Sequence, residues 1–252
     1  MRLLVALALL FFSSLAAGAG PLVAVAANLS KPMEALAANF AHDSGMGVRL
    51  TIGSSGDLLR QIRQGAPYEI YIAAAASYTQ RAQAENLTDG EPKVLALANL
   101  GAFIPAGSSL EAATDLAALG RMLAAGKYQR IAMANPEVAP FGVAAKQALE
   151  KMGVWTVEQD RVLLGENIAQ AVQFTLAGGV DVGFIPESYA LLPEVATHGR
   201  YLPIPSGFHD PLAQTMVLLR SAGTEARAFF LFLQSPTTRE FLLRSGYSAP
   251  AP

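Results

Sequence analysis

The stretch Leu22-Val23-Ala24-Val25-Ala26-Ala27-Asn28-Leu29-Ser30 joins a run of small apolar residues to a turn with polar side chains. Because the run has little polar alternation, it predicts a buried strand of a parallel sheet covered on both faces, from Leu22 to Ala27. Ser30 can cap the helix that follows, whose first turn tolerates Pro32. The stretch therefore predicts a strand, a turn and a helix in direct succession.

The same arrangement recurs three more times, at Gly53-Ser54-Ser55-Gly56, at 135–142 and at Gly165-Glu166-Asn167-Ile168. In an α/β protein such turns lie beyond the carboxyl ends of the strands. Each turn aims the first backbone N–H groups of a helix, which have no partner within the helix, at a point beyond the sheet. The four turns together predict a receptor for an oxyanion.

The remaining patterns predict an α/β protein of two lobes, each a mainly parallel sheet flanked by helices. Further strands are expected at 48–52, 69–72, 131–134, 162–164, 180–185 and 214–219, and a C-terminal helical region is expected around 228–243. The expected division is 20–99 with 206–252 for the first lobe and 100–205 for the second. Two Gly/Pro/Ser-rich segments, Ile104 to Ser109 and Pro203 to Pro211, lie near the expected crossings between the lobes.

The first 19 residues predict an export signal, with Arg2 at the start, an apolar run from Leu3 to Phe12 and a small-residue cleavage site at Ala17-Gly18-Ala19. The chain has no cysteine, which excludes disulfides, thiol catalysis and a lipid-anchored N-terminal cysteine. These features favour the periplasm. A net charge of −2 offers no basic surface for nucleic acid, so none is expected as a partner.

An exported serine hydrolase is the alternative from another class, with Ser54 or Ser55 as nucleophile and His42, His198 or His209 as base. The serine turn lacks the G-x-S-x-G pattern of a nucleophile elbow, and the histidines have no evident acid partner. Their spacing also fits no metal-binding motif. Glycosidase-like catalysis by a pair of acids, Glu166 and Asp181, is a further alternative that carries little weight. No enzymatic activity and no cofactor are therefore expected.

Six segments in order along the chain resemble the periplasmic molybdate-binding proteins of ABC importers. They are 23–28 (VAVAAN), 52–56 (IGSSG), 64–67 (QGAP), 134–142 (ANPEVAPFG), 165–168 (GENI) and 182–185 (VGFI). The resemblance implies a type II periplasmic-binding fold that closes on molybdate or tungstate and docks on an inner-membrane ABC permease. A monomer is expected.

The resemblance also implies the ligand-binding residues. Asn28 takes the first ligand position, Ser55 supplies a hydroxyl and a backbone N–H, and Phe141 and Ile168 supply backbone N–H groups; Ala27 adds another backbone donor. Two positions depart from the family. Pro186 stands where some members place a ligand-binding tyrosine, with Tyr189 three residues further on, and 73–76 (AAAA) replaces a Ser-Ala-Asp type segment.

The chemistry of the proposed contacts suits an oxyanion without protons. Molybdate is a dianion at neutral pH, so its oxygens accept hydrogen bonds and a carboxylate beside it would repel it. Helix N-termini and neutral donors can offset its loss of hydration, at about 1.5 to 3 kcal/mol for each charge-assisted bond. Asp57 is the one acid near the predicted contacts, and it is expected to face solvent in the first turn of a helix. Another oxyanion, such as sulfate, and a small organic solute remain alternative ligands.

Overall fold

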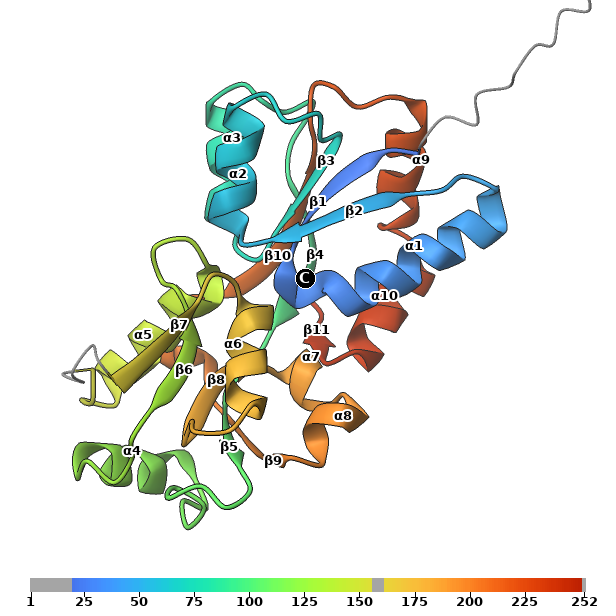
Figure 1. The fold of residues 1–252 in the computed structure, drawn as a ribbon. Helices are drawn as coiled ribbons and strands as arrows, with labels where there is room; N and C mark the ends of the chain where they lie inside the picture. Colours follow the sequence, from blue (N-terminus) through green and yellow to red (C-terminus); the bar gives the residue numbers. More distant parts are fainter. Residues whose placement is uncertain (1–19, 156–160, 251–252) are drawn as a thin grey trace, which may run out of the picture.

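The computed structural model describes residues 20–155 and 161–250 (Figure 1). The predicted export signal, 1–19, lies outside the described residues. Within the described part of the chain, no helix combines the length and the apolar character that crossing a membrane requires. The described chain forms two sheets with helices on their faces, which we call the first and the second lobe.

The first lobe is built on a six-stranded sheet in the order β11-β4-β10-β3-β1-β2. β1 lies between β2 and β3 and runs parallel to both, whereas β10 runs antiparallel to β3 and β4. The strands are β1 (Leu22–Ala26), β2 (Arg49–Gly53), β3 (Ile70–Ala73), β4 (Lys93–Ala98), β10 (Leu212–Leu218) and β11 (Tyr247–Ser248). The parallel half, β3-β1-β2, ends at the side that faces the second lobe (Figure 1).

Helices cover both faces of the first sheet. On one face, Phe40 packs edge-on against Phe229 with ring centroids 5.1 Å apart, and this aromatic contact joins α1 to α9. On the other face, Leu58 and Leu59 of α2 and Ala82 of α3 pack together in a separate cluster. The helices of this lobe are η1 (Ala27–Leu29), α1 (Ser30–Ser44), α2 (Ser55–Arg63), α3 (Ala76–Ala84), α9 (Thr224–Phe232) and α10 (Pro236–Arg244).

The second lobe has a five-stranded sheet in the order β7-β6-β8-β5-β9. β6 is parallel to β7 and β8, and β5 is antiparallel to β8 and β9. Its strands are β5 (Leu100–Pro105), β6 (Ile131–Ala134), β7 (Val162–Gly165), β8 (Val182–Pro186) and β9 (Gly199–Pro203). Its helices are α4 (Leu116–Ala124), α5 (Pro140–Lys151), α6 (Ile168–Leu176), α7 (Glu187–Ala190) and α8 (Pro193–Ala196), with η3 (Ser206–Phe208) leading back to the first lobe.

The chain passes between the sheets at two places. β4 ends at Ala98 and β5 begins at Leu100, so a single residue, Asn99, separates the two sheets. This crossing lies at the boundary expected between residues 99 and 100, whereas the nearby segment Ile104 to Ser109 holds the end of β5 and the turn that follows it. The prediction for Pro203 to Pro211 is confirmed, since β9 ends at Pro203 and β10 begins at Leu212.

The predicted strands are present with their ends shifted by one or two residues, and the strand at 131–134 has the predicted bounds. The prediction that Ser30 caps α1 is wrong. The residue before the helix is Leu29, and Ser30 is the first helical residue. Its hydroxyl instead meets the Tyr189 hydroxyl of the second lobe, 3.0 Å away. This contact could not be expected from local sequence, because the two residues are 159 positions apart.

Candidate ligand-binding cleft

Four strand-to-helix turns, two from each lobe, meet at one small cleft. The lining residues come from the ends of β1, β2 and β3 in the first lobe and from the starts of α5 and α6 in the second. They are Ala26, Ala27, Asn28, Gly53, Ser54, Ser55, Ala74, Ala139, Pro140, Phe141, Asn167 and Ile168. The structure therefore brings together all five sequence-predicted site residues, Ala27, Asn28, Ser55, Phe141 and Ile168.

The two serines of the β2–α2 turn have different partners. The Ser54 hydroxyl caps α2, since it accepts the N–H of Asp57 at 3.1 Å and donates to the Asp57 carboxylate at 2.7 Å. The Ser55 hydroxyl accepts the Ala74 N–H at 3.0 Å, which leaves its own proton to donate. Ser55 is 1% exposed and its carbonyl accepts the Tyr71 hydroxyl at 2.6 Å. Ser54 thus stabilises the helix, while Ser55 is an oriented donor at the cleft.

The Asn28 side chain is held from behind by Gln214 of β10. The Gln214 amide nitrogen donates to the Leu212 carbonyl at 2.8 Å, so its oxygen is the end that faces Asn28. This oxygen accepts a hydrogen bond from Asn28 Nδ2 at 2.7 Å. The second hydrogen of Nδ2 has only a 3.4 Å contact with the Tyr247 hydroxyl. The buried amide oxygen, Oδ1, has no hydrogen-bond partner in the described structure, so the second hydrogen of Nδ2, weakly held by Tyr247, is the one side-chain donor that remains to Asn28.

The second lobe offers main-chain donors. Pro140 begins α5 and has no N–H, so Phe141 carries the first N–H of that helix. Ile168 is the first residue of α6, whose preceding residue Asn167 caps the helix by accepting the Gln170 N–H at 3.2 Å. The side chains of Phe141 and Ile168 are buried at 1% and 3% exposure. The core therefore fixes the two helix starts, and their N–H groups need no polar side chain.

Glycine permits the close approach of α5 to the strand that precedes it. A Cβ atom on Gly142 would lie 2.3 Å from the Ala134 carbonyl oxygen, at the end of β6. Its other near neighbours, Asn135 C and Pro136 N, are also backbone atoms and would lie 2.7 Å away. Because backbone atoms cannot rotate aside, only glycine fits between the first turn of α5 and the end of β6.

The cleft is small and carries no formal charge. None of the twelve lining residues is acidic or basic. Asp57 is turned away toward Ser54 and toward Arg60, whose Nη2 lies 2.7 Å from its carboxylate. The volume of the cleft, about 10 Å³, is far below the roughly 300 to 1,000 Å³ of sites for organic ligands. These properties suit a compact anion that accepts hydrogen bonds.

The structure shows which contacts are made at the two positions that depart from the family pattern, near Pro186 and in the alanine run 73–76. Tyr189 does not line the cleft; its hydroxyl donates to the Ala27 carbonyl at 2.9 Å. In the alanine run, Ala74 forms hydrogen bonds through its backbone. Its N–H donates to the Ser55 hydroxyl at 3.0 Å, and its carbonyl oxygen lies 3.4 Å from the amide nitrogen of Gln214. The main chain at Ala74 thus supports both Ser55 and Gln214 without a polar side chain.

The histidines do not form a catalytic site with the serines. His42 bonds to Asp43, His198 to Thr197 and His209 to the Asp210 carbonyl. Among the described residues no group of three or more His, Cys, Asp or Glu side chains is placed to hold a metal ion.

Asp181 has a structural function rather than a place in an acid pair. Although its partial burial opposes ionisation, hydrogen bonds from Ser109 and from the Gln129 and Arg130 N–H groups hold the pKa of its carboxyl below the usual value.

Sequence reasoning did not find Gln214, Tyr247 and Tyr189 as neighbours of the site. Tyr247, in β11, donates its hydroxyl to the Asn28 carbonyl at 2.7 Å, across 219 positions of sequence. A glutamine in a mainly apolar strand was the one available signal: Gln214 is fully buried. A buried amide implies a specific polar partner, but the sequence does not say which one.

The cleft, enclosed between two α/β lobes that are joined by extended crossings, is the site of a solute receptor. In agreement, residues 21–248 match the family model for bacterial extracellular solute-binding proteins, and the chain belongs to this family. Its relatives include the molybdate-binding protein ModA of Rhodobacter capsulatus, 32% identical over 246 residues (96% of this chain and 94% of that protein). ModA of Azotobacter vinelandii is 30% identical over 249 residues (98% and 96%).

A solved structure agrees with these relatives. The periplasmic molybdate-binding protein of Azotobacter vinelandii superposes with a TM-score of 0.82 at 26% identity, covering 92% of this chain and all of that one. The two-lobed periplasmic-binding fold predicted from the sequence is therefore confirmed. The relatives are binding proteins and not enzymes, which also supports the prediction that this chain is a binding protein.

Proposed function

We propose that this protein is the periplasmic receptor of an ABC importer and captures molybdate or tungstate in the cleft between its lobes. The observation that carries the proposal is the convergence of Asn28, Ser55, Phe141 and Ile168 on a cleft without charged residues. The names of the relatives, molybdate-binding proteins at about a third identity over nearly the whole chain, support the choice of ligand. The predicted export signal supports the periplasm.

In this proposal the anion is held by the Ser55 hydroxyl, the second hydrogen of Asn28 Nδ2 and the first N–H group of each of three helices, that of Ser55 in α2, Phe141 in α5 and Ile168 in α6. Ala27 adds a backbone group at the β1 end. The helix N-termini contribute partial positive charge without a buried cation. No cofactor is required. The loaded monomer delivers its ligand to an inner-membrane permease.

Sulfate is the competing oxyanion, because it has the same charge and shape and accepts the same hydrogen bonds. In this proposal the size of the closed cavity discriminates against it. The cleft geometry argues against phosphate, which carries a proton at neutral pH and is better bound where a carboxylate accepts that proton. The small volume argues against an organic solute at this site.

The test is isothermal titration of the mature, anion-stripped protein with molybdate, tungstate, sulfate and phosphate in parallel at neutral pH. We expect tight binding of one molybdate or tungstate per chain and no measurable binding of the other two. Tight sulfate binding would replace the proposed ligand. No binding of any of the four would contradict the oxyanion site.

A further inference from the structure

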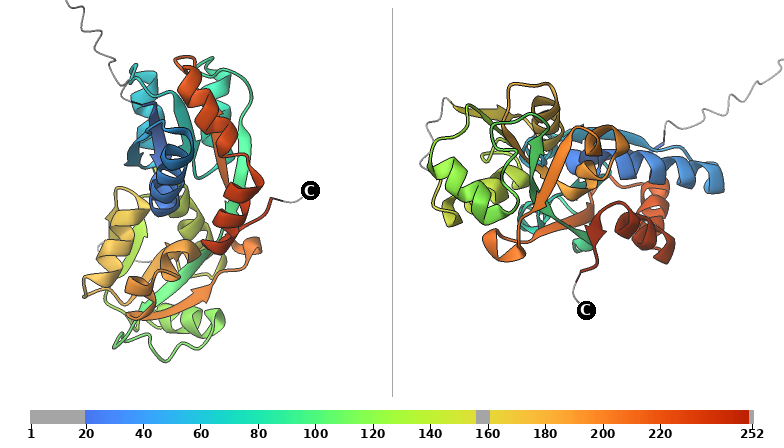
Figure 2. Two further views of the ribbon diagram at one scale, coloured as in Figure 1. Left: turned by 90° about the vertical axis from the view of Figure 1, so that its right-hand side faces the viewer. Right: turned by 90° about the horizontal axis from the view of Figure 1, so that it is seen from below.

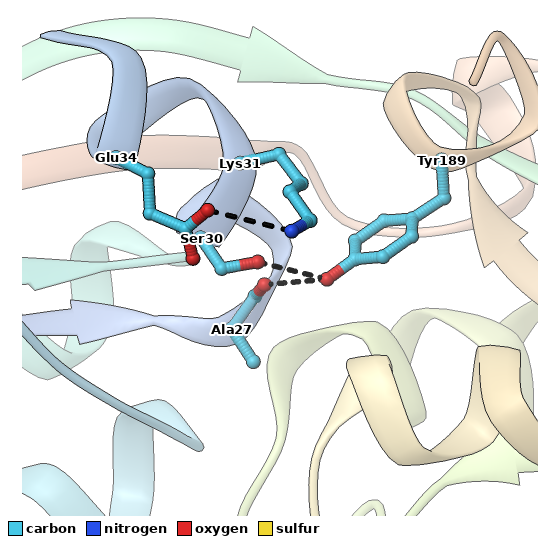
Figure 3. A network of polar contacts seen from close by, with 5 residues as sticks. All are labelled: Ala27, Ser30, Lys31, Glu34 and Tyr189. Atoms are coloured by element: carbon cyan, nitrogen blue, oxygen red, sulfur yellow. Dashed lines mark hydrogen bonds and ion pairs between the residues drawn. The ribbon is translucent and has the colours of Figure 1, made fainter.

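Tyr189 joins the two lobes at the turn that carries Asn28. It lies in α7 of the second lobe, and its hydroxyl sits between the Ala27 carbonyl and the Ser30 hydroxyl of the first lobe (Figure 3). A tyrosine hydroxyl has one proton, and that proton goes to the Ala27 carbonyl at 2.9 Å. Ser30 must then donate to Tyr189 at 3.0 Å. Both bonds are buried, and both cross from one lobe to the other.

The Tyr189 contact is a specific link rather than part of a packed interface. Next to it, the seam between α1, α7 and α10 holds a cavity of about 270 Å³, lined by Lys31 and Pro32 from one lobe and Leu191 and Leu192 from the other. The Lys31–Glu34 ion pair drawn beside it stays on one helix and is exposed, so it does not hold the lobes together (Figure 3). The tyrosine hydroxyl bridges the lobes beside this cavity, on the opposite side of the cleft turns from the Gly56 N–H, which donates to the Val138 carbonyl at 2.9 Å.

The contact also acts on the binding turn itself. The Ala27 carbonyl accepts both the Tyr189 hydroxyl and the Ser30 N–H, so the turn that places Asn28 is fixed from the second lobe. Burial raises the pKa of Tyr189, with a smaller opposing effect from the Ser30 bond, so the hydroxyl keeps its proton at neutral pH. Separation of the lobes would break both bonds, because Tyr189 moves with the second lobe and its partners move with the first.

We propose that Tyr189 is a positioning residue that retains the oxyanion by bonding the lobes together over the β1–α1 turn, without touching the anion. The inference rests on the proposed function, because it assigns Tyr189 to the retention of that ligand. Anion and tyrosine each require the same closed arrangement, so each stabilises the state that the other uses. Loss of the hydroxyl should therefore act mainly on the rate at which the ligand leaves.

The experiment compares Tyr189→Phe with Tyr201→Phe. Tyr201 lies in the same lobe, and its buried hydroxyl has no hydrogen-bond partner in the described structure, so its removal is the matched control. Radiolabelled molybdate is loaded, and its release into excess unlabelled molybdate is followed. We expect Tyr189→Phe to release it about five to ten times faster, an effect at the lower end for the loss of two buried hydrogen bonds. Tyr201→Phe and the association rates should stay within about twofold of wild type.

Ser30→Ala tests the partner. It should also speed release, and the double variant Ser30→Ala with Tyr189→Phe should be no faster than Tyr189→Phe alone, because Tyr189→Phe already removes the bond that Ser30 makes. Release from Tyr189→Phe at the wild-type rate would overturn the proposal. So would equal acceleration in Tyr201→Phe.

A second readout separates this proposal from the proposed function. Hydrogen exchange of the Ser30 amide, which donates to the Ala27 carbonyl, is measured in the anion-stripped protein. We expect exchange to be several-fold faster in Tyr189→Phe than in Tyr201→Phe. If wild type does not bind molybdate, the proposed function fails and this measurement alone decides the Tyr189 contact; equal exchange in the two variants would then overturn it.

Discussion

The two lobes offer the cleft different kinds of donor. The first lobe presents side chains, the Asn28 amide and the Ser55 hydroxyl, and each is oriented by a further bond, to Gln214 or to the Ala74 N–H. The second lobe presents the main-chain N–H groups of Phe141 and Ile168, whose side chains are buried. Side-chain donors depend on residue identity, whereas main-chain donors depend on where the backbone is placed. In the first lobe, mutations that remove a donor side chain should therefore weaken binding. In the second lobe, binding should weaken only when a mutation displaces the backbone.

The largest effect is expected from a backbone change in the second lobe. In Gly142→Ala the new methyl group would lie 2.3 Å from the Ala134 carbonyl oxygen, which displaces the first turn of α5 and the Phe141 N–H. We expect molybdate affinity, measured by titration, to fall on the order of 100-fold.

The control is Gly120→Ala in α4, where the nearest atom is the end of a flexible side chain, Met152 Cε at 3.4 Å. This variant should fold as stably as wild type or better, because alanine favours helix, and should keep its affinity. Unchanged binding by Gly142→Ala would show that the start of α5 does not need its present position.

The two serines of the first lobe should separate affinity from stability. Ser55→Ala removes an oriented donor, and we expect molybdate binding to weaken by about 1 to 3 kcal/mol. Ser54→Ala removes the cap of α2, and we expect about 0.5 to 2 kcal/mol less stability with affinity nearly unchanged. Titration and thermal unfolding of both variants check this. If Ser54→Ala weakened binding as much as Ser55→Ala, the assignment of cap and donor would be wrong.

A smaller effect is expected at Asn28. Asn28→Ala removes the amide, and we expect a loss of about 1 to 2 kcal/mol in affinity. Gln214→Met should give about half of that loss, because it leaves the Asn28 amide in place without its orienting partner. In the Asn28→Ala background Gln214→Met should add little to the loss in affinity. Full additivity of the two changes would show that Gln214 does not act through Asn28.

The smallest effects on binding are expected from side-chain changes in the second lobe. Phe141→Leu and Ile168→Val retain the main-chain N–H, so affinity should change by less than about threefold. The free energy of unfolding should still fall by about 0.5 to 1.5 kcal/mol, because the substituted core side chains are smaller or packed differently. A large loss of affinity with either variant would mean that these side chains, and not only their backbone, determine the shape of the cleft.

The difference between the lobes also explains what could be predicted. The order of strands, turns and helices follows from local apolar runs, glycines and prolines, and all five predicted site residues do line the cleft. The strands β4, β5, β9 and β11 and the helices α3, α4, α7 and α8 were not predicted from the sequence. The shortest of these, β11, α7 and α8, lack a periodic pattern of useful length. The first crossing lies at the expected boundary between residues 99 and 100, and no glycine or proline marks it, because β4 and β5 form nearly continuous extended chain (Figure 2).

The sequence by itself determined the α/β succession, the binding turns and the absence of charge among the proposed ligand contacts, since these depend on residues close together in the chain. Only the tertiary structure decided which hydroxyl of Ser54 and Ser55 is a helix cap, which end of the Asn28 amide is held, and that Tyr189 bonds to Ala27 and Ser30 instead of lining the cleft. The physical reason is that a polar side chain is oriented by whichever partner folding brings within about 3 Å. For Asn28 and Tyr189 those partners lie more than 150 positions away in the sequence.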